Sequence, residues 1–225
     1  MGIEVKICGL KTPEALEAAL EAGADLVGFV HFPKSPRHLS LAQATALTPL
    51  VRGRAATVAL VVDADDRLLA DIVATFAPDI LQLHGHETPE RVAQIRARFA
   101  RPVMKALPVS EAADLALVPD YASVADRLLF DAKPPPDAAL PGGNGRVFDW
   151  NLLSALDPGR PVMLSGGLDP SNVSQALARV RMDGVDVSSG VETEPGVKSP
   201  EKIHAFVRAV RAGATPSSQV GSQVS

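Results

Sequence analysis

Eight short apolar runs recur along the chain at nearly regular intervals, and this repetition limits the folds that the chain can adopt. The runs are rich in Val, Ile and Leu, as expected for strands that are buried on both faces of a parallel sheet. They cover residues 5–10, 25–32, 56–62, 79–85, 102–109, 127–133, 161–168 and 184–191.

Segments with helix start signals lie between the runs. Four of them place Thr, Asp or Ser before Pro, which suits an N-cap followed by the first helical residue. These four segments are KTPEALEAAL, ETPERVAQI, LDPSNVSQAL and KSPEKIHAFV. Gly23 suits the C-terminal end of the first helix. Further expected N-caps are Ser40, Asp65, Ser110 and Asp149.

Strand, loop and helix thus alternate eight times, which predicts a parallel sheet built from βαβ units. Eight such units in 225 residues favour the α/β class and a single-domain (β/α)8 TIM barrel over residues 1–212. An open doubly wound sheet is the alternative, but its common GxGxxG first turn is absent. Residues 134–148 are expected to form a long loop after the sixth strand, and the small, polar residues 213–225 a disordered tail.

Composition excludes several classes of function. A single cysteine rules out an internal disulfide and a multi-cysteine metal site. The start of the chain has no signal-peptide pattern, and no apolar run is long enough to span a membrane, so a cytoplasmic protein is expected. A net charge of −4 and few aromatic residues argue against a nucleic-acid partner.

The functional site of such a barrel lies at the carboxyl ends of its strands. Because side chains alternate along a strand, Val5 and Ile7 are expected to face the helices, and Lys6 and Cys8 to point into the barrel mouth. The same alternation turns Asp131 inward from the sixth strand, so one group could remove a proton while the other supplies one. The residues alone equally allow a buried structural thiol, and an aspartate that caps a turn or pairs with Lys133.

Two glycine-containing loops follow the seventh and eighth strands, where phosphate sites of these barrels are commonly built. The loops are LSGGLDPSNV and VDVSSGVE, and backbone N–H groups in such loops bind anions. The candidate phosphate-binding residues are Gly166, Gly167, Ser189 and Gly190. The alternative is that the glycines only form tight turns.

Polar residues after the second and fourth strands complete the candidate site. Arg37 could hold a carboxylate in bidentate fashion, although an exposed surface arginine is equally compatible with the sequence. His84 and His86 are two apart, but no further ligand cluster accompanies them, so no metal is expected. Gln82 and His84 are expected to support the reacting groups from behind.

Several motifs, in this order, together resemble the phosphoribosylanthranilate isomerase family of tryptophan biosynthesis. They are KICGL, FPKSPR, LQLHG, LLFDAK, GGNGRVFDW, LSGGLDPSNV, and GVDVSSGVE followed by GVKSPEKI. The resemblance extends from about residue 3 to residue 211. One departure is Asp63, where the family more often has Asn, which puts a polar role of that loop in doubt.

The resemblance implies a cofactor-free barrel that rearranges N-(5-phosphoribosyl)anthranilate to 1-(2-carboxyphenylamino)-1-deoxyribulose 5-phosphate. It implies that Cys8 is the general base and Asp131 the general acid, and that Arg37 holds the anthranilate carboxylate. It also implies that the phosphate lies against Gly166, Gly167, Ser189 and Gly190. A thiol pKa below the ordinary value of about 8.5 would help Cys8 to act as a base.

Three other functions stay open at this point. The histidine-pathway aminoaldose isomerase performs the same type of rearrangement, but usually with two aspartates, whereas the first strand here carries Cys8. A catalytically silent phosphosugar-binding barrel would be expected to lack the acid or the base. A redox sensor at Cys8 would lack a resolving cysteine. Whether a partner enzyme of the tryptophan pathway receives the product cannot be decided from the sequence.

Overall fold

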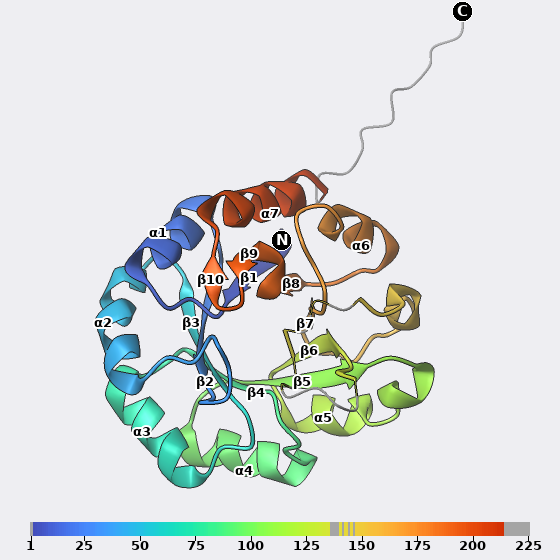
Figure 1. The fold of residues 1–225 in the computed structure, drawn as a ribbon. Coiled ribbons are helices and arrows are strands. Elements are labelled where there is room, and N and C mark those ends of the chain that lie inside the picture. Colours follow the sequence, from blue (N-terminus) through green and yellow to red (C-terminus); the bar gives the residue numbers. More distant parts are fainter. Residues whose placement is uncertain (1, 136–139, 141, 144, 146, 214–225) are drawn as a thin grey trace, which may run out of the picture.

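The eight predicted strands all form, and they close into one parallel barrel in chain order (Figure 1). The computed structural model describes residues 2–135, 140, 142–143, 145 and 147–213. β1 pairs with both β2 and β8, which closes the sheet and confirms the barrel over the open alternative. The strands are β1 (Glu4–Cys8), β2 (Leu26–His31), β3 (Ala56–Val61), β4 (Ile80–Leu83), β5 (Val103–Val109), β6 (Arg127–Ala132), β7 (Val162–Leu164) and β8 (Gly184–Val187).

Helices form a ring around this barrel (Figure 1). The α-helices are α1 (Pro13–Ala22), α2 (Leu41–Val51), α3 (Asp66–Phe76), α4 (Pro89–Phe99), α5 (Val118–Val124), α6 (Val173–Arg179) and α7 (Pro200–Gly213). Most predicted start signals are confirmed, because these side chains accept a backbone N–H of the first turn: Thr12, Ser40, Asp65, Thr88 and Ser199. Gly23 ends α1 in the left-handed conformation, also as predicted.

Two predicted N-caps are wrong. Asp169 does not begin a helix, because its carboxylate accepts the N–H groups of Ser171 and Asn172 in a turn, and α6 starts only after Asn172. Ser110 donates its hydroxyl to Asp114, and a short 3-10 helix, η1 (Ala112–Leu115), follows it.

The sixth unit also departs from the predicted pattern. Asp149 caps only a 3-10 helix, η2 (Trp150–Leu153), and the described residues between β6 and β7 hold no α-helix. After β8 the chain forms a 3-10 turn, η3 (Ser189–Val191), and a small hairpin of β9 (Glu192–Glu194) and β10 (Val197–Lys198) before α7. The predicted tail, apart from Gly213, lies outside the described residues.

The inside of the barrel is divided into two halves. Apolar side chains near the amino ends of the strands fill one half: Leu26, Val58, Ile80, Met104, Ala106, Leu129 and Met163. Cys8 packs with Val30 and Leu60 toward the carboxyl ends. Outward-facing residues such as Val5, Ile7 and Phe130 belong to the separate core between strands and helices. The apolar half closes the barrel from below, and the pocket of the barrel lies at the carboxyl ends of the strands.

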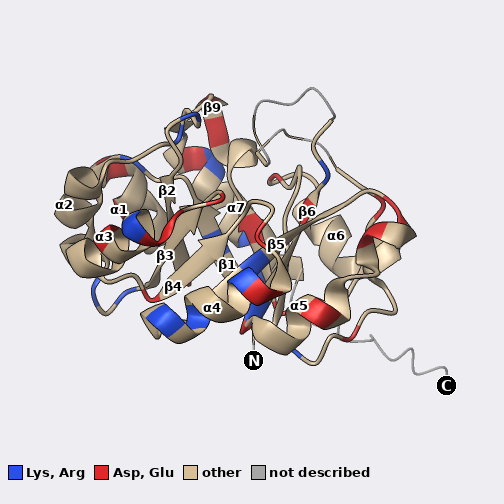
Figure 2. Cartoon of the chain, turned by 90° about the horizontal axis from the view of Figure 1, so that it is seen from below, with Lys and Arg blue, Asp and Glu red and all other residues tan. Residues whose placement is uncertain are grey.

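Charged residues of both signs are mixed over the outer helices (Figure 2). Several form ion pairs between neighbouring elements, such as Arg96 of α4 with Asp126 before β6. Across residues 2–213, where described, no helix is long and apolar enough to cross a membrane.

His31 makes folding sensitive to acid. Burial lowers its pKa from 6.5 to about 4, and its ring lies 5.4 Å from the ring of Phe76. The folded protein therefore favours neutral His31, and this stabilisation is complete above about pH 6.5 and is lost as the pH falls toward 4. The corresponding loss is about 3 kcal/mol.

We expect His31→Leu to remove this part of the pH dependence in urea unfolding at pH 7 and pH 4. Equal stability losses in His31→Leu and the unchanged protein would contradict this reading.

Candidate active site

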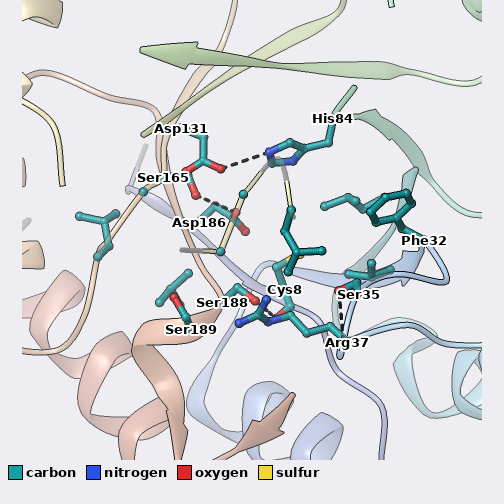
Figure 3. Close-up of a pocket in the computed structure, with 18 of the residues that line it drawn as sticks. Cys8, Phe32, Ser35, Arg37, His84, Asp131, Ser165, Asp186, Ser188 and Ser189 are labelled. Atoms are coloured by element: carbon teal, nitrogen blue, oxygen red, sulfur yellow. Dashed lines mark hydrogen bonds and ion pairs between the residues drawn. The ribbon is translucent and has the colours of Figure 1, made fainter. Parts of the chain in front are cut away.

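One pocket lies at the carboxyl ends of the strands and brings together most of the predicted site residues (Figure 3). The predicted residues that line it are Cys8, Arg37, His84, Asp131, Gly166, Gly167 and Ser189. Gln82 is fully buried behind His84. Gly190 follows Ser189. A Cβ atom at Gly190 would lie 1.9 Å from the Leu168 carbonyl oxygen, so the loops after β7 and β8 are in close contact at this glycine.

Cys8 ends β1 at the wall of this pocket. Its side chain is buried, and the Ser188 hydroxyl donates to its backbone carbonyl. Burial raises the pKa of the thiol, and the nearby Lys6 ammonium only partly opposes this. The lowered pKa that would favour a base is therefore absent from the free protein, in which Cys8 is a neutral thiol at pH 7.

Asp131 faces His84 across the pocket, in the upper part of Figure 3. His84 Nε2 lies 3.1 Å from Asp131 Oδ2, and Gln82 Nε2 lies 3.2 Å from His84 Nδ1. The other Asp131 oxygen accepts the N–H of Ala132 at 2.9 Å. Lys133 pairs with Asp114 instead, so the alternative of an Asp131–Lys133 pair is wrong.

His86 does not share in this site. Its side chain is 94% exposed, and its ring lies 3.1 Å from Asp63, which also accepts its backbone N–H. Asp63 therefore joins the loops after β3 and β4, at the edge of the site. In the part of the chain that the structure describes, no group of three or more His, Cys, Asp or Glu could hold a metal ion.

Arg37 is buried, so the alternative of a surface arginine is wrong. Its Nε and Nη2 donate to the two carboxylate oxygens of Glu192, at 2.8 and 2.7 Å. Glu192 also accepts from Lys198 at 2.7 Å. Burial alone would raise the pKa of Glu192, but Arg37 and Lys198 hold this pKa below its ordinary value. Among the described residues no hydrogen bond to Nη1 is found, and this end of the guanidinium could bind a carboxylate in the pocket.

The two glycine-containing loops form a concave surface of backbone donors. Gly166 and Gly167 have φ angles of 86° and 62°, which favour glycine. A Cβ at Gly166 would lie 2.4 Å from the backbone nitrogen of Ala132, so the loop approaches β6 closely. Among the described groups, the N–H groups of Gly166, Gly167, Ser189 and Gly190 donate to no other residue. Unpaired N–H groups of this kind suit an anion.

Sequence reasoning turned Lys6 into the barrel but missed its partner Asp186, and it also missed the charges of Glu192 and Lys198. Lys6 forms a buried pair with Asp186, which also accepts the Ser165 hydroxyl. Glu192 ends the motif GVDVSSGVE and Lys198 lies in GVKSPEKI, but neither residue was given a role. The strand alternation that turned Lys6 inward would also have found Asp186, a charged residue in the eighth predicted strand.

The Arg37–Glu192–Lys198 cluster predicts a stability effect. We expect Glu192→Gln to lower the free energy of unfolding by about 3 to 5 kcal/mol, because two buried cations lose their shared partner. The matched control is Glu17→Gln, which breaks the exposed pair of Glu17 and Arg54 and should change stability little. Urea unfolding measures both; equal losses in the two variants would rule out a special role for burial.

Comparison with known proteins agrees with this geometry. The model of the family N-(5'phosphoribosyl)anthranilate (PRA) isomerase matches residues 5–209. An N-(5'-phosphoribosyl)anthranilate isomerase of Azorhizobium caulinodans is 76% identical over 94% of this chain and 93% of its own length. The corresponding enzyme of Bradyrhizobium diazoefficiens is 60% identical over 94% of this chain and 95% of its own.

Solved structures extend the agreement to the fold. Phosphoribosyl anthranilate isomerase from Thermotoga maritima superposes with a TM-score of 0.85 at 36% identity, over 93% of this chain and 99% of that one. Another such isomerase, with a TM-score of 0.81 at 33% identity and the same coverage, is in complex with reduced 1-(o-carboxyphenylamino)-1-deoxyribulose 5-phosphate. Family model, relatives and fold agree, and the chain belongs to the phosphoribosylanthranilate isomerase family.

Proposed function

We propose that Cys8 is the base and Asp131 the acid with which this isomerase converts N-(5'-phosphoribosyl)anthranilate to 1-(2-carboxyphenylamino)-1-deoxyribulose 5-phosphate. The observation that carries the assignment is that both side chains line one pocket, together with an arginine and an anion-binding surface. The complex of a relative with the reduced compound supports the choice of substrate.

The substrate has two anionic ends, and the pocket offers two places for them. The phosphate binds the free N–H groups of Gly166, Gly167 and Ser189. The anthranilate carboxylate binds the Nη1 end of Arg37, which Glu192 holds in place. The apolar wall of Val30, Phe32, Leu60 and Val62 suits the aromatic ring. Binding both ends orients the reacting carbons between acid and base.

Asp131 starts the reaction by giving a proton to the ring oxygen of the sugar. The bond between C1 and this oxygen breaks, and the anthranilate nitrogen supplies the electron pair that forms the C1=N bond of a Schiff base. His84 Nε2 lies 3.1 Å from Asp131 Oδ2, so it is within hydrogen-bond distance of the acid and can hold the carboxyl group in position.

Cys8, as a thiolate, then removes the proton from C2. The electrons of the C2–H bond form C1=C2, and the electrons of C1=N return to nitrogen, which gives an enolamine. Gain of a proton at C1 and loss of one from the C2 hydroxyl give the ketone, so substrate and product contain the same atoms. A thiol that must stay reduced fits the reducing cytoplasm.

We expect Cys8→Ala and Asp131→Asn each to lower kcat at least about a hundredfold, since an acid or base group typically contributes about 10²–10⁴-fold. Substrate binding should be retained, because Arg37 and the phosphate loops are unchanged. The loss of anthranilate-group fluorescence from freshly made substrate measures turnover.

The outcomes separate the alternatives. An unaffected Cys8→Ala would show that another group is the base. An unchanged protein that binds the substrate without turnover would point to a silent binding barrel. Faster turnover of the histidine-pathway aminoaldose would favour that pathway.

His84 and His86 form a matched pair for testing the acid. We expect His84→Asn to lower kcat at least about tenfold and to alter its pH profile, because Asp131 loses its hydrogen-bond partner. His86→Asn, two residues away and exposed, should behave like the unchanged protein. Equal activity of the two variants would contradict a role for His84.

A further inference from the structure

A buried ion pair lies inside the barrel, next to Cys8. Lys6 Nζ lies 2.7 Å from Asp186 Oδ1, and the exposed fractions of the two side chains are 0% and 6%. The Ser165 hydroxyl donates to the other Asp186 oxygen at 3.1 Å, a contact that Figure 3 shows as a dashed line. Such a pair adds little stability, because desolvating both ions costs about as much as their attraction returns. Its presence therefore calls for a functional reason.

Gly28 of β2 leaves space between the ion pair and the thiol. A Cβ atom at this position would lie 2.9 Å from Cys8 Sγ and 3.2 Å from Lys6 Nζ. Gly28 is not among the residues with a positive φ, so the backbone conformation does not require glycine there. Its missing side chain instead lets the sulfur and the ammonium lie on either side of one small space.

The charged groups that act on Cys8 come from three strands. Lys6 lies on the same strand, Asp186 comes from β8 and Lys198 from β10, while the neighbouring β2 presents only Gly28 and Val30. Lys6 and Lys198 favour the thiolate, and burial and Asp186 oppose it. Burial would lower the pKa of Lys6, but Asp186 holds it above its ordinary value, so Lys6 stays charged at neutral pH.

We propose that Lys6 is a positioning residue for the reaction, and that its buried ammonium, fixed by Asp186, stabilises the Cys8 thiolate when the base forms. This inference rests on the proposed role of Cys8. Lys6 exchanges no proton in this step. Cys8 loses its proton, and the nearby ammonium stabilises the resulting thiolate, which is buried and therefore poorly solvated by water. Asp186 keeps Lys6 protonated, and Ser165 keeps Asp186 in place.

The single cysteine of the chain makes the test direct. The ultraviolet absorbance of the thiolate is titrated as the difference between each protein and its Cys8→Ala counterpart, so no turnover is needed. We expect Lys6→Met to raise the titration midpoint of Cys8 by about 1 pH unit or more. The pH profile of kcat/KM should move in the same direction, with about a tenfold loss at pH 7 for each pH unit.

A second variant covers the case in which Lys6→Met alone does not fold. Lys6→Met with Asp186→Asn removes both charges, and its midpoint should also rise, because the ammonium is gone. The matched control is Lys105→Met with Glu87→Gln. This change removes another buried ion pair of the barrel, and neither of its residues is among the groups that act on Cys8.

An unchanged midpoint in the Lys6 variants, or an equal rise in the Lys105 control, overturns the inference. Because the titration reports the thiol itself, that result leaves the role of Cys8 to the Cys8→Ala assay. Conversely, an active Cys8→Ala would overturn the proposed function, whatever the titration shows.

Discussion

Closure of the barrel by β1 is the constraint on which the site depends. β1 hydrogen-bonds to β2 on one side and to β8 on the other, so it cannot shift its register without breaking two ladders. Cys8 is held opposite Gly28 by this pairing, and Lys6 opposite Asp186. Register alone therefore places the thiol, the ammonium and its carboxylate together, and the loops after β7 and β8 reach the same rim.

The division of the barrel interior explains why charge can be buried there. Seven apolar side chains fill the amino-terminal half. Toward the carboxyl ends, buried charges are held by partners: Asp186 holds Lys6, and Glu192 holds both Arg37 and Lys198. Paired in this way, the charges are fixed in direction, which lets them act on a substrate without reorganising.

Sequence periodicity predicted the architecture because the apolar runs, the helix start signals and the alternation of side chains along the strands all indicate the same fold. The apolar runs located all eight strands, and N-cap residues followed by Pro marked several helix starts. Strand alternation turned Cys8 and Asp131 inward. The failures have local causes. Asp169 looks like an N-cap, but its carboxylate closes a turn with Ser171 and Asn172. The partnership of Arg37 with Glu192 joins residues 155 positions apart, and no spacing rule connects them.

Burial of the base has two opposite effects on the reaction. It raises the pKa of Cys8, so fewer molecules carry a thiolate at neutral pH, but each thiolate that forms is a stronger base toward a C–H bond. A cation placed too close would increase the population and weaken the base, whereas no cation would leave the thiolate almost unpopulated. Lys6 stays charged, but the negative charge of Asp186 beside it offsets part of its attraction for the sulfur. Asp186 therefore limits how far Lys6 lowers the pKa of Cys8. This balance explains why the site contains both the ammonium and the carboxylate.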